Sequence, residues 1–143
     1  MRLIDIGANL ASNQFKGDRD EVLARAREAG VERLVITGSD VDGSGEAADL
    51  ADTDPAAWST AGVHPHHAKD LDGAGLERIA SLLGRPRVVA VGECGLDYNR
   101  NYSPREDQLR AFVALREIAS RVGLPGFVHQ RDAHAELLAM LRS

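Results

Sequence analysis

The chain has 143 residues, a length that accommodates one domain with a real hydrophobic core. Its hydrophobic content of 43% and charged content of 27% are globular values and exclude a disordered or fibrous composition. The net charge of -5 argues against non-specific coating of nucleic acid or anionic membranes, which requires clustered Lys and Arg. It leaves open an enzyme that holds phosphates through a bound metal.

The cysteine content and the lack of long apolar runs indicate a cytoplasmic protein. Cys94 is the single cysteine, so an internal disulfide cannot form, which suits a reducing compartment. No apolar run in the sequence approaches the length needed to span a membrane. We therefore expect a cytoplasmic α/β protein without a membrane partner.

Five short apolar runs recur along the chain, and segments with helical patterning separate them. The predicted strands cover residues 3–6, 33–37, 58–63, 88–91 and 125–129. Alternation of strand and helix at this spacing predicts repeated βα units, and hence a parallel sheet with right-handed crossovers.

Start and stop signals mark four of the helices between and after these strands. They cover residues 18–30, 76–83 and 103–123, and a last stretch after Asp132. Asp18 and Ser103 are the expected N-caps, and Gly30 and Gly123 are the expected left-handed residues at the C-terminal ends. No linker or low-complexity segment divides the chain, so we expect one domain.

The residues that could carry chemistry follow three consecutive predicted strands. His64 and His66 come after the third strand, Glu93 after the fourth, and His129 at the end of the fifth. The C-terminal ends of parallel strands converge on one face, so Glu93 and His129 are expected to be neighbours. A carboxylate and an imidazole are a usual start of a divalent-metal site, which further ligands must complete.

Each of these residues also has a plain structural explanation. A single Glu at a strand end is more often a solvated rim residue, and His64 and His66 could be polar loop residues around a Pro turn. Asp132 could do no more than cap the last helix, and Cys94 is most simply a small buried residue. The common position of three polar clusters at one end of consecutive strands favours the functional explanation.

Three segments resemble the motifs of the TatD family of metal-dependent hydrolases, many of which are deoxyribonucleases. They are GVHPH at 62–66, GECGLDY at 92–98 and HQRDAH at 129–134, in the order and spacing of the family. The resemblance covers the whole chain and is closest to the branch that includes TatD itself. It implies a TIM-type (β/α)8 barrel of the α/β class, of which residues 1–143 would form the N-terminal part with only the first five βα units.

The resemblance also implies roles for individual residues. Glu93 would be the catalytic metal ligand, and His129 would be a ligand at a second metal position. His64 and His66 would line the substrate pocket against a phosphate. Arg131 is a weaker candidate for a phosphate contact.

At the end of the first strand the chain differs from most of the family. Most members have His-x-His there, whereas this chain has Gly-Ala-Asn, so Asn9 is at best a weak metal ligand. The loss of two imidazoles favours a harder ion, Mg²⁺, with Zn²⁺ or Mn²⁺ as possible alternatives. The implied activity is 3′-5′ exonuclease-like cleavage of phosphodiester bonds in single-stranded DNA or at DNA ends.

Two other functions stay open at this point. Related barrels hydrolyse other substrates with the same kind of metal site, because a fold does not fix a function. The chain could also be a non-enzymatic fragment, since a later His ligand and a catalytic Asp of the family have no counterpart in it. The missing units would leave the first and fifth strands as open edges, so we expect impaired turnover and self-association through these edges.

Overall fold

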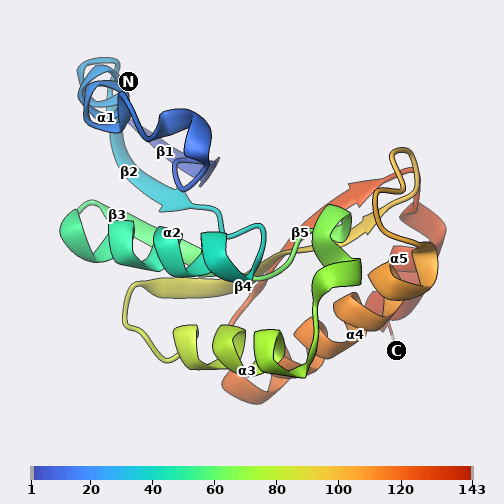
Figure 1. Cartoon of the computed structure of the whole chain (residues 1–143). Coiled ribbons are helices and arrows are strands. Elements are labelled where there is room, and N and C mark those ends of the chain that lie inside the picture. The colour runs from blue at the N-terminus through green and yellow to red at the C-terminus, as the bar shows by residue number, and fades with distance from the viewer. Residues whose placement is uncertain (1, 143) are drawn as a thin grey trace.

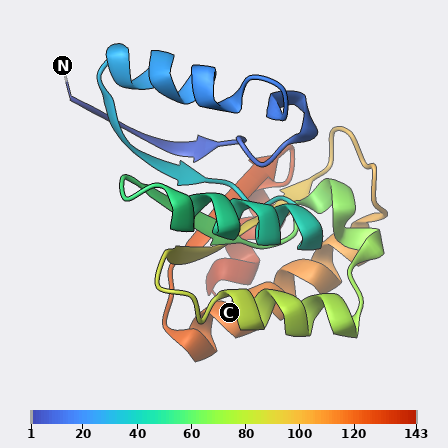
Figure 2. The same cartoon turned by 60° about the vertical axis from the view of Figure 1, so that its left-hand side comes forward.

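The computed structural model describes residues 2–142, which form a five-stranded parallel sheet flanked by helices (Figure 1). The elements are β1 Leu3–Ala8, η1 Asn13–Phe15, α1 Arg19–Glu28, β2 Val31–Ile36, α2 Val41–Thr53, β3 Ala57–Ala61, η2 Pro65–Asp70, α3 Gly73–Leu82, β4 Val88–Asp97, α4 Arg105–Val122, β5 Gly126–Arg131 and α5 His134–Arg142. The strand order β1-β2-β3-β4-β5 follows the chain, and every pair is parallel. Figure 2 shows α1, α2 and α3 one above the other in chain order along the sheet. The predicted βα alternation is confirmed, and the five units form an incomplete barrel.

Strand β4 is longer than the sequence predicts. The apolar run ends at Val91, but the strand continues to Asp97 and pairs with β5 from Val91 to Asp97, with a register shift between Gly92 and Cys94 at which Glu93 lies. Gly95 explains the difference, because its backbone has a φ of +141° and an added Cβ would lie 2.0 Å from the carbonyl oxygen of His129. This glycine allows close approach of two strands, where the sequence alone suggests a turn.

Helix α2 is absent from the predicted elements. Its sequence contains two glycines and mostly small or acidic residues, which give a weak helical pattern. The helix begins where the side chain of Asp40 accepts a hydrogen bond of 2.7 Å from the backbone N–H of Gly43. Ala47 and Ala51 are fully buried, so α2 is held by close packing of small side chains.

The expected helix ends are only partly correct. Gly30 and Gly123 have φ values of +95° and +71°, as predicted for left-handed residues after a helix. Asp18 precedes α1 but makes no capping hydrogen bond, and the residue before α4 is Pro104 rather than Ser103. Ser103 is fully buried, and its hydroxyl hydrogen-bonds to the backbone of η2 instead.

The core is thick on the β4 side of the sheet and thin on the β1 side. The larger cluster packs α3, α4 and α5 against β3 and β4, and includes Phe112, Leu115 and Leu96. The smaller cluster lies beneath α1 and α2, and no residue of α1 is buried. Within residues 2–142, no helix combines the length and apolarity that a membrane crossing requires.

Candidate active site

Side chains from three consecutive strand segments meet at one end of the sheet. His64 follows β3, Glu93 lies in β4 and His129 lies in β5. Glu93 Oε1 is 3.3 Å from His129 Nδ1 and 3.9 Å from His64 Nε2. One ligand atom from each of the three residues lies within 4.8 Å of the others. The structure thus places Glu93 and His129 side by side, the arrangement expected for neighbouring parallel strands.

The separation of Glu93 and His129 fits a shared divalent ion. Two ligands at about 2.1 Å from one ion lie about 3.0 Å apart in octahedral geometry and about 3.4 Å apart in tetrahedral geometry. The measured distance between Glu93 Oε1 and His129 Nδ1 is 3.3 Å. Nε2 of His129 is buried and makes no hydrogen bond within residues 2–142, although Asp97 Oδ2 lies 3.3 Å away. The two side chains therefore fit as a metal-ligand pair without rearrangement.

His64 belongs to the same cluster, but its hydrogen bonding suits a different role. Its Nδ1 accepts a hydrogen bond of 3.1 Å from the backbone N–H of His66. Burial, and then the neighbouring His129 and His66, lower the pKa of His64 to about 3, so the ring is neutral near pH 7. We therefore assign the ring proton to Nε2, the nitrogen that faces Glu93. An N–H in this position donates to an anionic oxygen and does not bind a metal ion.

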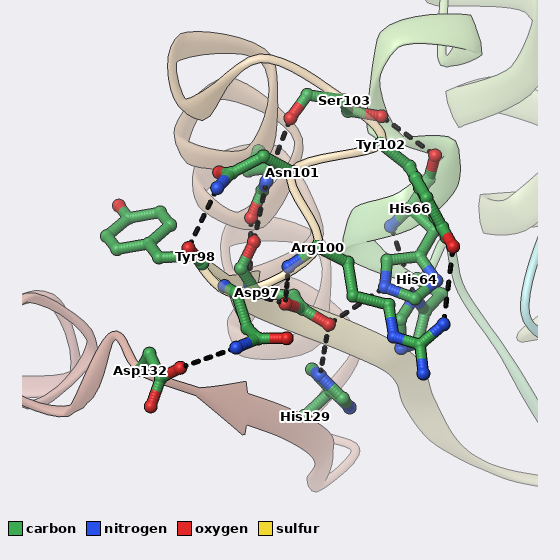
Figure 3. A network of polar contacts seen from close by, with 12 residues as sticks. His64, His66, Asp97, Tyr98, Arg100, Asn101, Tyr102, Ser103, His129 and Asp132 are labelled. Carbon is green, nitrogen blue, oxygen red and sulfur yellow. Dashed lines mark hydrogen bonds and ion pairs between the residues drawn. The ribbon is translucent and has the colours of Figure 1, made fainter.

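Asp97 is the central residue that the sequence interpretation missed (Figure 3). Its side chain is 1% exposed, and Oδ1 accepts hydrogen bonds from the backbone N–H groups of Asn99 at 3.1 Å and Arg100 at 2.9 Å. Oδ2 accepts one from His66 Nε2 at 2.8 Å and lies 3.3 Å from His129 Nε2. Burial raises the pKa of Asp97, but the bonds from Arg100, His66 and Asn99 outweigh it and bring the pKa down to about 2. A permanently ionised Asp97 therefore orients both imidazoles.

The loop after β4 fixes Asp97 and His66 relative to each other. Ser103 Oγ donates to the backbone oxygen of His66 at 2.9 Å and accepts from the backbone N–H of Lys69 at 3.1 Å. Gln108, also buried, accepts from the backbone N–H of Asp97 at 2.8 Å and donates to its carbonyl oxygen at 3.1 Å. Ser103 therefore joins this loop to η2, which explains why it does not cap α4.

A cavity of about 300 Å³ lies over the cluster. It is lined by Glu93, His64 and His66 and also by Asn9 and Thr37. Asn9 therefore shares a cavity with the expected ligand Glu93. Thr37 is 5% exposed, and its Oγ1 has no hydrogen-bond partner within residues 2–142. No pattern in the sequence marks Thr37. Asp97 lies in the motif at residues 92–98, but only the continuation of β4 beyond Val91 brings it beside the histidines.

The structure does not bring Arg131 into the cluster. Its side chain is exposed and forms no ion pair or hydrogen bond within residues 2–142, so its phosphate contact stays a prediction. Arg100 is nearer, on the loop drawn in Figure 3. Its Nη1 donates to Tyr102 Oη at 3.2 Å, and the Tyr102 ring packs edge-on against His66 with centroids 4.7 Å apart. Arg100 is therefore the cation that the structure offers beside the histidines.

Comparisons with known proteins identify the family of the chain. Residues 4–143 match the family described as TatD related DNase. Proteins from Shigella flexneri serotype 5b and Escherichia coli K12, both named 3′-5′ ssDNA/RNA exonuclease TatD, are 50% identical over 139 residues. Each match covers 97% of this chain and 54% of the relative, so the chain spans about half the length of the curated relatives it matches.

Solved structures give the same result for the fold. A TatD homologue from Escherichia coli K12 matches with a TM-score of 0.90 at 28% identity, over 99% of this chain and 55% of that one. An uncharacterized amidohydrolase from Saccharomyces cerevisiae matches with a TM-score of 0.88 at 25% identity, over 99% of this chain and 51% of the amidohydrolase. The predicted family and the incomplete barrel are confirmed. This chain belongs to the family of TatD related DNases.

Proposed function

We propose that this chain carries the metal-binding half of a nuclease that cleaves single-stranded DNA or RNA from the 3′ end with a divalent ion. The observation that carries the proposal is the pair of Glu93 Oε1 and His129 Nδ1, 3.3 Å apart on adjacent strands. The names of the 50% identical relatives support the substrate class and the direction of cleavage.

The donors in the cavity favour Mg²⁺ as the ion. Glu93 and Asn9, which line the cavity, offer oxygen atoms, and His129, which lies beside Glu93 and outside the lining, offers one nitrogen. Oxygen-rich sites prefer Mg²⁺ or Mn²⁺ over Zn²⁺. When bound, the ion lowers the pKa of a coordinated water and polarises the phosphoryl oxygens.

The remaining residues of the cluster position the reacting groups. The Nε2–H of His64 donates a hydrogen bond to a non-bridging phosphate oxygen, and Arg100 supplies positive charge beside it. Asp97 Oδ2 lies 3.3 Å from His129 Nε2, and its negative charge favours the tautomer that is protonated there, so that Nδ1, 3.3 Å from Glu93 Oε1, is left to bind the ion. His66 is held by Asp97 and lines the same cavity.

The test uses 5′-labelled single-stranded DNA with Mg²⁺ or with EDTA. Two protein ligands bind an ion weakly, so we expect metal-dependent binding of the DNA and little release of nucleotides by the 143-residue chain. Glu93→Gln should abolish the dependence of DNA binding on Mg²⁺. Glu77→Gln, on the exposed face of α3, should leave this dependence unchanged. Binding that is the same in Mg²⁺ and EDTA contradicts the proposal.

The open edges of the sheet lead us to propose self-association as well. β1 pairs only with β2, and β5 pairs only with β4, within residues 2–142. Ile4 and Ile6 on β1 are 61% and 67% exposed, and Val128 on β5 is 41% exposed. Unprotected apolar edges recruit further strands. Light scattering coupled to size-exclusion chromatography should show a dimer or larger species that Ile6→Lys dissociates; a monomeric unmodified chain contradicts this.

A further inference from the structure

A second cavity, of about 470 Å³, adjoins the cavity over Glu93 on the side of η1 and α2. Asn9, Ser39 and His67 line both cavities, so the two are continuous. The volume lies within the range of roughly 300–1,000 Å³ that is usual for small-molecule sites. Apart from Asn9, which lines both cavities, none of its lining residues has a role in the proposed nuclease site.

One wall of the second cavity carries free carboxamide groups. Asn13 and Gln14, on η1, are exposed, and Asn9 lies where the two cavities meet. The side-chain amides of these three residues make no hydrogen bond to the protein within residues 2–142. A carboxamide offers a donor and an acceptor side by side, the pattern that pairs with the edge of a nucleobase.

A second part of the lining, formed by the N-cap and first turns of α2, is acidic. It carries Asp40, Asp42 and Glu46. Glu46 is the least engaged of these carboxylates, since its ion-pair partner Lys16 lies 3.9 Å away at the exposed rim. Negative charge on this wall repels phosphate and accepts hydrogen bonds from N–H groups. The cavity therefore suits a neutral group that presents N–H donors, while the phosphate lies over Glu93 and His64.

We propose that this second cavity binds the 3′-terminal nucleobase of the substrate and selects bases with an amino group at the N6 or N4 position, adenine and cytosine, over thymine, which has the O4 oxygen there. The inference rests on the proposed nuclease function. Glu46 accepts the hydrogen bond of the exocyclic amino group, and Asn13 pairs with the ring edge beside it. Thymine presents the O4 acceptor at the corresponding position, so it meets the carboxylate of Glu46 with a repulsive contact.

The experiment measures binding by fluorescence anisotropy with 5′-labelled single-stranded oligonucleotides in Mn²⁺. The oligonucleotides differ only in the 3′-terminal base, which is dA, dC or dT. We expect the unmodified chain to bind the dA and dC ends at least roughly fivefold more tightly than the dT end. Glu46→Gln should bring the three affinities together, because an amide can also donate to O4. Asn13→Ala should weaken binding of all three.

Asp49→Asn is the matched control, because Asp49 lies on the same helix, outside both cavities, in an exposed ion pair with Arg85. It should leave the base preference unchanged. Metal-dependent binding with equal affinity for the three ends overturns the base site and leaves the proposed function standing. Failure to bind any of the oligonucleotides while Mn²⁺ binds overturns both.

Discussion

The substitution Asp97→Asn tests the orienting role of the buried carboxylate. The asparagine keeps one carbonyl oxygen for the backbone N–H groups of Asn99 and Arg100. It replaces the negative oxygen beside His66 Nε2, 2.8 Å away, by a neutral amide. The variant therefore loses a charge-assisted hydrogen bond while His66 and the backbone donors stay buried.

The loss of this bond at a site that is 1% exposed should cost about 2 kcal/mol of unfolding free energy at pH 7. With a slope of about 2 kcal/mol per molar urea, the unfolding midpoint falls by about 1 M. The folded-state pKa of Asp97 is about 2, below its ordinary value of 3.8. Ionised Asp97 therefore contributes its full stabilisation above pH 3.8, and this stabilisation is lost as the pH falls through about 2. The difference in unfolding free energy between the unmodified chain and Asp97→Asn should shrink over this pH range.

Urea titration followed by far-UV circular dichroism measures the stability, and isothermal calorimetry measures Mn²⁺ binding. Because the charge of Asp97, 3.3 Å from Nε2 of His129, favours a proton on that nitrogen, Mn²⁺ affinity should fall by roughly 10- to 100-fold in Asp97→Asn. Asp132→Asn is the control, since within residues 2–142 the side chain of the exposed Asp132 hydrogen-bonds only to Asn99 Nδ2, at 3.1 Å. An unchanged midpoint refutes the hydrogen-bond reasoning. A lower midpoint with unchanged Mn²⁺ affinity refutes the orienting role alone.

Two further predictions concern the packing around the site. Gly62→Ala should destabilise the fold by about 1–3 kcal/mol, since the new Cβ would lie 2.4 Å from Cα of Gly92. Gly73→Ala should instead stabilise the fold by about 0.5–1 kcal/mol, because an added Cβ there meets nothing within 4 Å. Thermal unfolding of the two variants should show a lower midpoint for Gly62→Ala and a higher one for Gly73→Ala. Cys94 is 3% exposed, and burial followed by the charge of Glu93 raises its thiol pKa to about 12. Ellman's reagent should therefore label it only after unfolding, and fast labelling of the native chain contradicts this.

The sheet could be predicted because its order follows from local signals. Apolar runs such as Val88–Val91, separated by helical patterns, are enough to give a parallel sheet in chain order. The extension of β4 beyond Val91 could not be predicted, because Gly95 becomes part of a strand only through its contact with the backbone of β5. Helix α2 was missed for a similar reason, since the burial of Ala47 depends on its tertiary contacts.

The candidate site, like the sheet, could be predicted from the sequence only in part. Glu93 and His129 could be brought together from sequence, because parallel strand ends converge and the strands are consecutive. The role of Asp97 could not be predicted from sequence, because the backbone amide donors that help to lower its pKa are placed around it by the loop conformation. The donor character of His64 depends on one bond from the backbone of His66 to its Nδ1, which no pattern of residue types reveals.

The most direct test of the metal site is Mn²⁺ binding by the unmodified chain and by Glu93→Gln, measured by electron paramagnetic resonance and calorimetry. Glu93 and His129 are the two side chains whose donor atoms, 3.3 Å apart, fit one ion. We expect one Mn²⁺ per chain, removable by EDTA, and a loss of affinity in Glu93→Gln greater than the roughly 10- to 100-fold of an outer-shell change. Equal Mn²⁺ binding by the two chains would contradict a metal site at Glu93.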